Sequence, residues 1–185
     1  MSMPLLSRNG WTLDGLAALP DDGNRYEIID GELFVTPTPT MRHQMIVSDL
    51  FRILDAYVCE LGQELFGSPI GVPFSERTYI EPDMTVVPRV NGKRPVAFSD
   101  AGVLTLAVEV LSPSTARRDR TVKRVMYQKN NVPEYWVVDI DARTIEVWRP
   151  TDPQPRVCRD RLDWQPSPPH PSLEIDVNAF FAALD

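Results

Sequence analysis

The 185-residue sequence has few cysteines and an excess of acidic over basic side chains. Cys59 and Cys158 are far apart, form no C-x-x-C pair and cannot supply a zinc site by themselves, which favours a reduced, cytoplasmic setting. The 26 acidic residues against 19 lysines and arginines give a net charge of -7. This balance argues against broad, nonspecific coating of nucleic acid, although a local basic patch could still bind phosphates.

Long apolar runs are also missing. No segment approaches the roughly 18 apolar residues that span a bilayer, and the N-terminus lacks a charged segment followed by an apolar one, the mark of an export signal. We therefore expect a soluble protein with no membrane association. With 43% hydrophobic residues and no internal repeat or long linker, residues 1–185 are expected to form a single domain with one core.

Hydrophobic periodicity predicts two main helices. Residues 41–62 carry apolar side chains at helical spacing, with Thr40 as the N-cap and Gly62 as the stop. Residues 117–130 form the second helix, which Asn131 closes in a left-handed conformation. Shorter helices are expected at residues 11–20 and 177–184.

Alternating apolar segments bounded by glycine and proline predict strands between these helices. A first hairpin is expected at residues 25–35, turning at Asp30 and Gly31. Further strands are predicted at residues 64–74, 78–87 and 103–112, followed by a hairpin at residues 134–140 and 144–148. The proline-rich segment 152–175 fits either a surface arm or an edge segment. The fold class is therefore α/β (α+β), with a mixed sheet flanked by helices.

A glutamate interrupts the apolar strand "LAVEVLS". Leu106, Val108 and Val110 share one face at period two, so Glu109 points to the other face. Asp83 repeats this oddity in "TYIEPDMTVV". If the two strands are neighbours, the carboxylates converge and need a cation or a shared proton. A hard divalent ion, Mg²⁺ or Mn²⁺, held by Asp83 and Glu109 is the economical solution, whereas exposed or salt-bridged carboxylates are the alternative.

The predicted helix at 117–130 adds a lysine to this pair. Asp119, Lys123 and Tyr127 fall at i, i+4 and i+8 along one face, with Val122 and Met126 expected to pack inward beside them. Lys123 could reach the strand carboxylates, or it could form an ordinary helix pair with Asp119. The basic stretch from residue 117 to residue 124 suits a phosphate-facing edge or a solvated face.

Taken together, these segments resemble a known family. The order "EPD" at 81–83, "VEVLSPST" at 108–115, then Asp119, Lys123, Tyr127 and "VPEYWVVD" at 132–139 resembles the Uma family of bacterial restriction endonucleases. The segments "LPDDGNRYEIIDGELF" and "PSLEIDVNAFF" extend the resemblance over nearly the whole chain. It implies the PD-(D/E)xK nuclease fold, a restriction-endonuclease-like core with added N-terminal and C-terminal hairpins.

The resemblance also implies a set of site residues. Asp83 and Glu109 match the acidic positions that bind the divalent metal, Mg²⁺ or Mn²⁺. The lysine that such nucleases carry two residues after the glutamate is absent, because Leu111 stands there, and Lys123 looks like its replacement from the next helix. Glu27 and His43 match further family positions. As alternatives, His43 could serve the helix N-terminus and Glu27 could pair with an arginine.

The activity implied is metal-dependent hydrolysis of DNA phosphodiester bonds. Because cutting both strands commonly uses two sites, a homodimer is expected. Two other hypotheses remain open at this point. One is a catalytically silent binding module on the same fold, and the other is a metal-dependent hydrolase of another phosphate ester.

Overall fold

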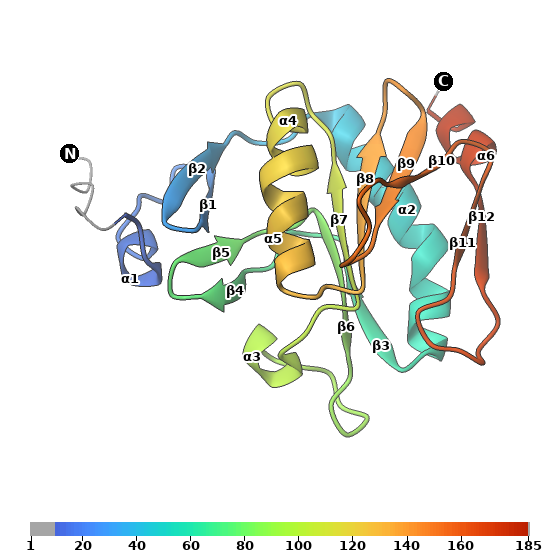
Figure 1. Ribbon diagram of the computed structural model, residues 1–185, viewed down its shortest axis with the longest axis horizontal. Helices are drawn as coiled ribbons and strands as arrows, with labels where there is room; N and C mark the ends of the chain where they lie inside the picture. Colours follow the sequence, from blue (N-terminus) through green and yellow to red (C-terminus); the bar gives the residue numbers. More distant parts are fainter. Residues whose placement is uncertain (1–9, 185) are drawn as a thin grey trace.

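The computed structural model describes residues 10–184, which begin with a short helix and a hairpin at one end of the molecule (Figure 1). Helix α1 spans Leu13–Leu16, and strands β1 (Arg25–Ile29) and β2 (Glu32–Thr36) pair antiparallel, which confirms the predicted hairpin. Its turn residues, Asp30 and Gly31, have φ angles of 51° and 86°, the left-handed backbone that a tight two-residue turn requires.

Helix α2 runs from Met41 to Glu60, as predicted. Its N-cap is Thr40, whose side chain accepts a hydrogen bond from His43 N at 3.3 Å, and Gly62 beyond its end has a φ of 68°. The apolar stripe of the helix is buried against the central sheet and consists of Ile46, Val47, Leu50, Leu54, Tyr57 and Val58. The cap thus fixes the turn of α2 that carries His43.

The central sheet has six strands in the order β10-β9-β8-β7-β6-β3. Only β7 and β8 run parallel, and the other four pairs are antiparallel, so the sheet is mixed as expected. Its strands are β3 (Gln63–Phe66), β6 (Met84–Pro88), β7 (Leu106–Val110), β8 (Glu134–Asp139), β9 (Thr144–Trp148) and β10 (Arg156–Cys158).

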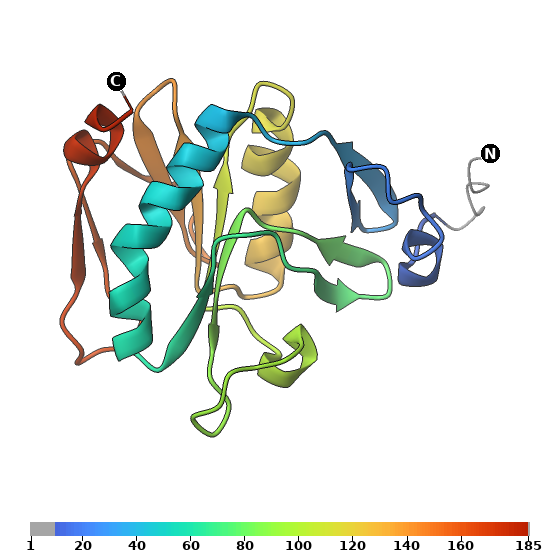
Figure 2. The ribbon, with the colours of Figure 1, turned by 180° about the vertical axis from the view of Figure 1, so that it is seen from behind.

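Helices cover both faces of this sheet. The helical segment α4 (Ala116–Arg118), π-turn (Asp119–Lys123) and α5 (Arg124–Lys129) lies in front of the sheet in Figure 1, whereas α2 lies in front of it in Figure 2. Alternate residues of β7 divide between the two layers. Leu106, Val108 and Val110 face the core under α2, while Ala107 belongs to the core under α5. Glu109, at the same period as Ala107, therefore faces the α5 side.

Two predicted strands are each divided in two. Residues 64–74 form β3 in the central sheet and β4 (Val72–Ser75) in a second sheet, and residues 78–87 form β5 (Thr78–Ile80) and β6. The second sheet has the order β2-β1-β5-β4. Pro82, which has no N–H to give to a ladder, marks the second break. Asp83 consequently lies just before β6, which corrects the expectation of a carboxylate in the middle of a strand.

The helix after β7 also departs from the predicted periodicity. Met126 is buried as expected, but Val122 is 39% exposed, so its predicted inward packing is wrong. The π-helical turn Asp119–Lys123 explains this difference, because a wider turn shifts the angular position of each residue relative to an α-helix. Asp119, Lys123 and Tyr127 nevertheless all remain on the buried face.

The proline-rich segment forms an edge rather than a free arm. It contributes edge strand β10 and then the hairpin of β11 (Arg161–Trp164) and β12 (Leu173–Asp176), followed by α6 (Val177–Ala182). Trp164 is fully buried and packs against Tyr57 of α2 at a ring-centroid distance of 5.6 Å. This is the added C-terminal hairpin of the expected fold. One further short helix, α3 (Phe98–Ala101), lies between β6 and β7.

Among residues 10–184, no helix is both long and apolar enough to cross a bilayer. The single-domain organisation stays a prediction.

The α2 cap gives a first testable prediction. Thr40→Ala removes the acceptor for His43 N, so we expect the free energy of unfolding to fall by about 1 kcal/mol. Urea denaturation followed by circular dichroism measures it. Ser48→Ala, on the exposed face of the same helix, is the matched control and should change stability by less than about 0.5 kcal/mol. Equal losses in both variants would contradict a capping role.

Candidate active site

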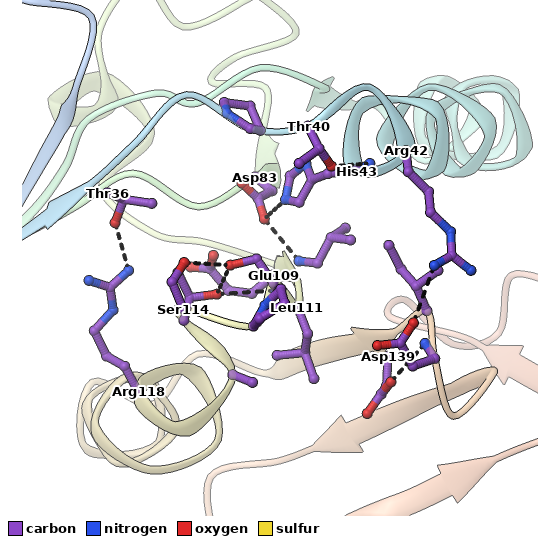
Figure 3. A pocket seen from close by; sticks show the side chains of 18 of the residues that line it. Thr36, Thr40, Arg42, His43, Asp83, Glu109, Leu111, Ser114, Arg118 and Asp139 are labelled. Carbon is purple, nitrogen blue, oxygen red and sulfur yellow. Dashed lines mark hydrogen bonds and ion pairs between the residues drawn. The ribbon is translucent and has the colours of Figure 1, made fainter.

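The five residues predicted for the site lie together in the structure. Glu27 comes from β1, His43 from the first turn of α2, Asp83 from the residue before β6, Glu109 from β7 and Lys123 from the π-turn. Each is at most 5% exposed. Figure 3 shows His43, Asp83 and Glu109 close together, between Arg118 and Arg42. Segments far apart in the sequence therefore bring their polar side chains to one buried place.

The pairing of β6 and β7 sets the two carboxylates beside one another. Met84 is the partner of Val108 in the antiparallel ladder, so Asp83 lies opposite Glu109 when this register is extended by one residue. Val110 N donates a hydrogen bond of 2.9 Å to Asp83 Oδ2. The expectation that these strands are neighbours is confirmed.

Asp83 has a partner on each oxygen. Arg25 Nη1 lies 2.8 Å from Oδ1, and His43 Nε2 lies 3.0 Å from Oδ2. Because an ionised carboxylate only accepts hydrogen bonds, Nε2 of His43 carries the proton. Burial alone would raise the pKa of Asp83, but the hydrogen bond and charge of His43, the charge of Arg25 and the Val110 N–H together lower it to about 2. Asp83 is therefore a stable buried anion.

Glu109 is held from the helical side. Its Oε1 accepts a hydrogen bond from Lys123 Nζ at 2.7 Å and one from Tyr127 Oη at 3.1 Å. Lys123 Nζ also lies 2.8 Å from Glu27 Oε1 and 3.9 Å from Asp119 Oδ1. The short contacts go to the strand carboxylates, so Lys123 is not an ordinary helix partner of Asp119. It links β1 to β7 through one ammonium group.

Negative charge is concentrated around this lysine. Burial strongly raises the pKa of Glu109, and the nearby carboxylates of Asp83, Asp119 and Glu27 raise it further against the opposing effect of Lys123. Burial would lower the pKa of Lys123, but the carboxylates around it reverse the direction and raise it. The lysine therefore stays charged. The single ammonium group does not offset the burial of all the carboxylates around it, and the raised pKa of Glu109 reflects this.

The structure adds two residues to the site, Arg25 and Arg118, which the sequence analysis did not predict there. Arg118 Nη2 donates to Thr36 Oγ1 at 2.8 Å and lies 3.4 Å from Glu27 Oε2 (Figure 3 shows the Thr36 contact). Arg25 stands two residues before Glu27 on β1, and that period-two spacing was the available signal that both face the same way. For Arg118 the basic composition of its stretch was the only signal. Glu27 does pair with an arginine, as the alternative reading held, but it pairs with Lys123 as well.

The cluster opens into a cleft of about 670 Å³. Four carboxylates line it, Asp83, Glu109, Asp139 and Asp141, together with arginine and hydroxyl side chains, namely Arg25, Arg42, Arg118, Arg120, Thr36, Thr38, Thr40, Ser112, Ser114 and Thr115. Guanidinium and hydroxyl groups are the donors that bind phosphate oxygens in proteins. The cleft therefore gathers four arginines in a chain that is acidic overall, and three of them are paired with carboxylates of the same lining.

Comparison with known proteins identifies the family and the fold. The family profile of Uma2, whose description reads "Putative restriction endonuclease", matches residues 13–178. The chain belongs to the Uma2 family. A crystal structure described as a "putative nuclease belonging to DUF820", from Anabaena variabilis ATCC 29413, is 24% identical to this Uma2 chain with a TM-score of 0.76. The match covers 94% of the Uma2 chain and 99% of the other chain, and it shows the restriction-endonuclease-like fold. No curated protein matches.

At this site of the Uma2 chain, few side chains could act as metal ligands. Among the residues that the structure describes, no three histidine, cysteine or acidic side chains are grouped so as to hold an ion. The available donors are the carboxylates of Asp83 and Glu109. Two hard oxygen donors with excess negative charge around them fit Mg²⁺ or Mn²⁺, ions that retain several water ligands. Asp119 Oδ1, buried and without a hydrogen-bond partner, adds to the unbalanced charge.

Asp83 gives a prediction for acid stability. Its folded pKa of about 2 lies below the ordinary value of 3.8, so its stabilising contribution is complete above pH 3.8 and is lost as the pH falls toward 2. We expect the free energy of unfolding of the wild type to fall by about 2 kcal/mol more than that of Asp83→Asn between pH 5 and about pH 2. Urea unfolding across this range measures the difference. Parallel pH profiles would contradict it.

Proposed function

We propose that this Uma2 protein is a Mg²⁺- or Mn²⁺-dependent DNA endonuclease that hydrolyses phosphodiester bonds. The observation that carries the proposal is the buried set of Asp83, Glu109 and Lys123, in which the two carboxylates line a cleft rich in arginine and Lys123 contacts Glu109 from behind. Membership of a family described as restriction endonucleases supports a nuclease in general terms. The divalent ion and the DNA substrate follow from the chemistry of the donors.

Asp83 and Glu109 would hold the metal, which would polarise the scissile phosphate and lower the pKa of an attacking water. Lys123 is the residue that we assign to orienting this water or to stabilising the charge of the pentavalent transition state. Its ammonium is fixed by Glu27 at 2.8 Å and by Glu109 at 2.7 Å, so little reorganisation is required during the reaction. Glu27 thus acts by positioning Lys123.

His43 is assigned a positioning role as well. It donates to Asp83 Oδ2 at 3.0 Å and is held at the start of α2 by the Thr40 cap. This contact fixes the orientation of the Asp83 carboxylate, as hydrogen-bonded partners commonly do for ligating groups. His43 therefore serves both the helix terminus and the site.

The arginine and hydroxyl side chains that line the cleft support a phosphodiester substrate. Arg118 and Arg42 lie on opposite sides of the carboxylate pair in Figure 3, one on the helix after β7 and one on α2. Neutralising phosphates with such side chains releases counterions and provides sequence-independent affinity. The net charge of -7 limits this attraction to the cleft itself. We therefore propose DNA as the substrate and place the protein in the cytoplasm, where DNA is accessible.

Plasmid nicking is the decisive test. Wild-type protein with Mg²⁺ or Mn²⁺ should convert supercoiled plasmid to the nicked or linear form, and chelation by EDTA should stop it. Asp83→Asn, Glu109→Gln and Lys123→Met should each lower the rate about 100-fold or more, because each removes a group that acts on the reacting atoms.

The matched control is Lys129→Met. Lys129 lies in the same helical segment as Lys123, but it is 70% exposed and its ion pair is with Asp30 at 3.8 Å rather than with a site carboxylate. Its loss should leave the nicking rate within about twofold of wild type. Hydrolysis of bis(p-nitrophenyl) phosphate without nicking would support a different phosphate ester, and metal binding without any hydrolysis would support a silent binding module.

We also propose that two copies of this single domain form a homodimer, because two sites cut both strands of a duplex. Sedimentation velocity at the concentration used for nicking should give a mass near twice 21.0 kDa. Double-strand cleavage should then depend on dimer concentration, whereas single-strand nicking should not. A monomer at every working concentration would contradict this proposal.

A further inference from the structure

Arg25 pairs with Oδ1 of Asp83, the carboxylate oxygen that is more accessible to another cation. Asp83 Oδ2 already accepts from both His43 Nε2 and Val110 N, whereas Oδ1 is paired with Arg25 Nη1 at 2.8 Å. A divalent ion binding this carboxylate must therefore share Oδ1 with a guanidinium. Two cations on one buried oxygen repel each other strongly, because little water screens them.

The two side chains that pair with Asp83, His43 and Arg25, differ in how easily they can move away from the carboxylate. The His43 side chain is 7% exposed and belongs to the capped first turn of α2. The Arg25 side chain is 18% exposed, begins strand β1 and lines the cleft. Its long stem can move the charged head toward the cleft while the backbone stays in the β1–β2 ladder.

We infer that Arg25 is an internal counter-cation of Asp83 that the divalent metal displaces, so that arginine and metal occupy this carboxylate in turn. This inference rests on the proposed metal site. It means that metal affinity is set partly by an exchange of cations, and that Arg25 lowers this affinity in wild-type protein. Arg25 also keeps the buried Asp83 carboxylate neutralised until metal arrives, which stabilises the metal-free protein.

Isothermal titration with Mn²⁺ at fixed pH and ionic strength tests the exchange. Arg25→Met should bind Mn²⁺ about tenfold more tightly than wild type, since a charged hydrogen bond no longer competes for Asp83. Arg42→Met is the matched control. It removes one positive charge from the same cleft, but from a contact with Asp141 at 3.2 Å, and should change the affinity by less than about twofold.

A second comparison shows whether the effect acts through Asp83. Asp83→Asn should lose most Mn²⁺ binding, and adding Arg25→Met to it should not restore binding, because the carboxylate for which the two cations compete is absent. Arg25→Lys, which keeps the charge, should bind Mn²⁺ within about threefold of wild type. If Arg25→Met does not fold, Arg25→Gln takes its place in every comparison.

Thermal unfolding supplies a second readout. Without metal, the Tm of Arg25→Met should fall below that of wild type, and Mn²⁺ should raise it by more degrees than it raises the wild-type Tm. Equal or weaker Mn²⁺ binding by Arg25→Met, beside a wild type that binds, would overturn the exchange and leave the metal site intact. Absence of Mn²⁺ binding in both proteins would overturn the metal site and the exchange together.

Discussion

The ammonium group of Lys123 lies among carboxylates contributed by three separate elements. Glu27 comes from the hairpin sheet, Glu109 from the central sheet and Asp119 from the same helical segment as the lysine. Removing two or more buried anions from water is costly, and a shared, fully buried cation offsets that cost only with good geometry. Lys123 therefore helps to hold the β1–β2 hairpin against the central sheet, beside the Arg25–Asp83 and Arg118–Glu27 contacts, and it orients Glu109 together with Tyr127.

The π-turn is the local feature that makes this arrangement possible. It spans Asp119–Lys123, so both ends of the turn are site residues. The wider turn keeps Asp119 and Lys123 on the buried face while Val122 points outward, and α5 then resumes with Tyr127 over Glu109. In an uninterrupted α-helix, Val122 would lie closer to the face of Asp119 and so nearer the buried side. Irregular helix geometry is thus part of how this segment presents Lys123 to Glu27 and Glu109.

The sequence predicted the parts of the site that follow a simple period. Glu109 was visible because its strand alternates strictly, and Lys123 because it shares a helical face with Asp119 and Tyr127. The resemblance to a family added Glu27 and His43, which no period marks as polar partners of Asp83 and Lys123. Hydrophobic alternation failed at Asp83, because Pro82 ends one strand before the next begins, and the two strands belong to different sheets.

Arg25 and Arg118 escaped prediction for a different reason. Their roles depend on how the hairpin docks against the start of β6 and against the helix after β7, and that docking is a tertiary property with no counterpart in local spacing. Arg118 reaches Thr36 and Glu27 on the hairpin, and Arg25 reaches Asp83 beside β6. The role of each arginine can be recognised only when the hairpin sheet is seen docked on the central sheet.

Overall charge conceals this local arrangement. The chain carries a net charge of -7, yet the cleft gathers four arginine side chains beside four carboxylates. A ligand that presents phosphate oxygens to the arginines and a metal to the carboxylates would satisfy both sets of groups at once. The arginines and the carboxylates otherwise neutralise each other, as Arg25 and Asp83 do. The same side chains can therefore stabilise the empty cleft and recognise its ligand, because each contact among them is one that a ligand of opposite polarity can replace.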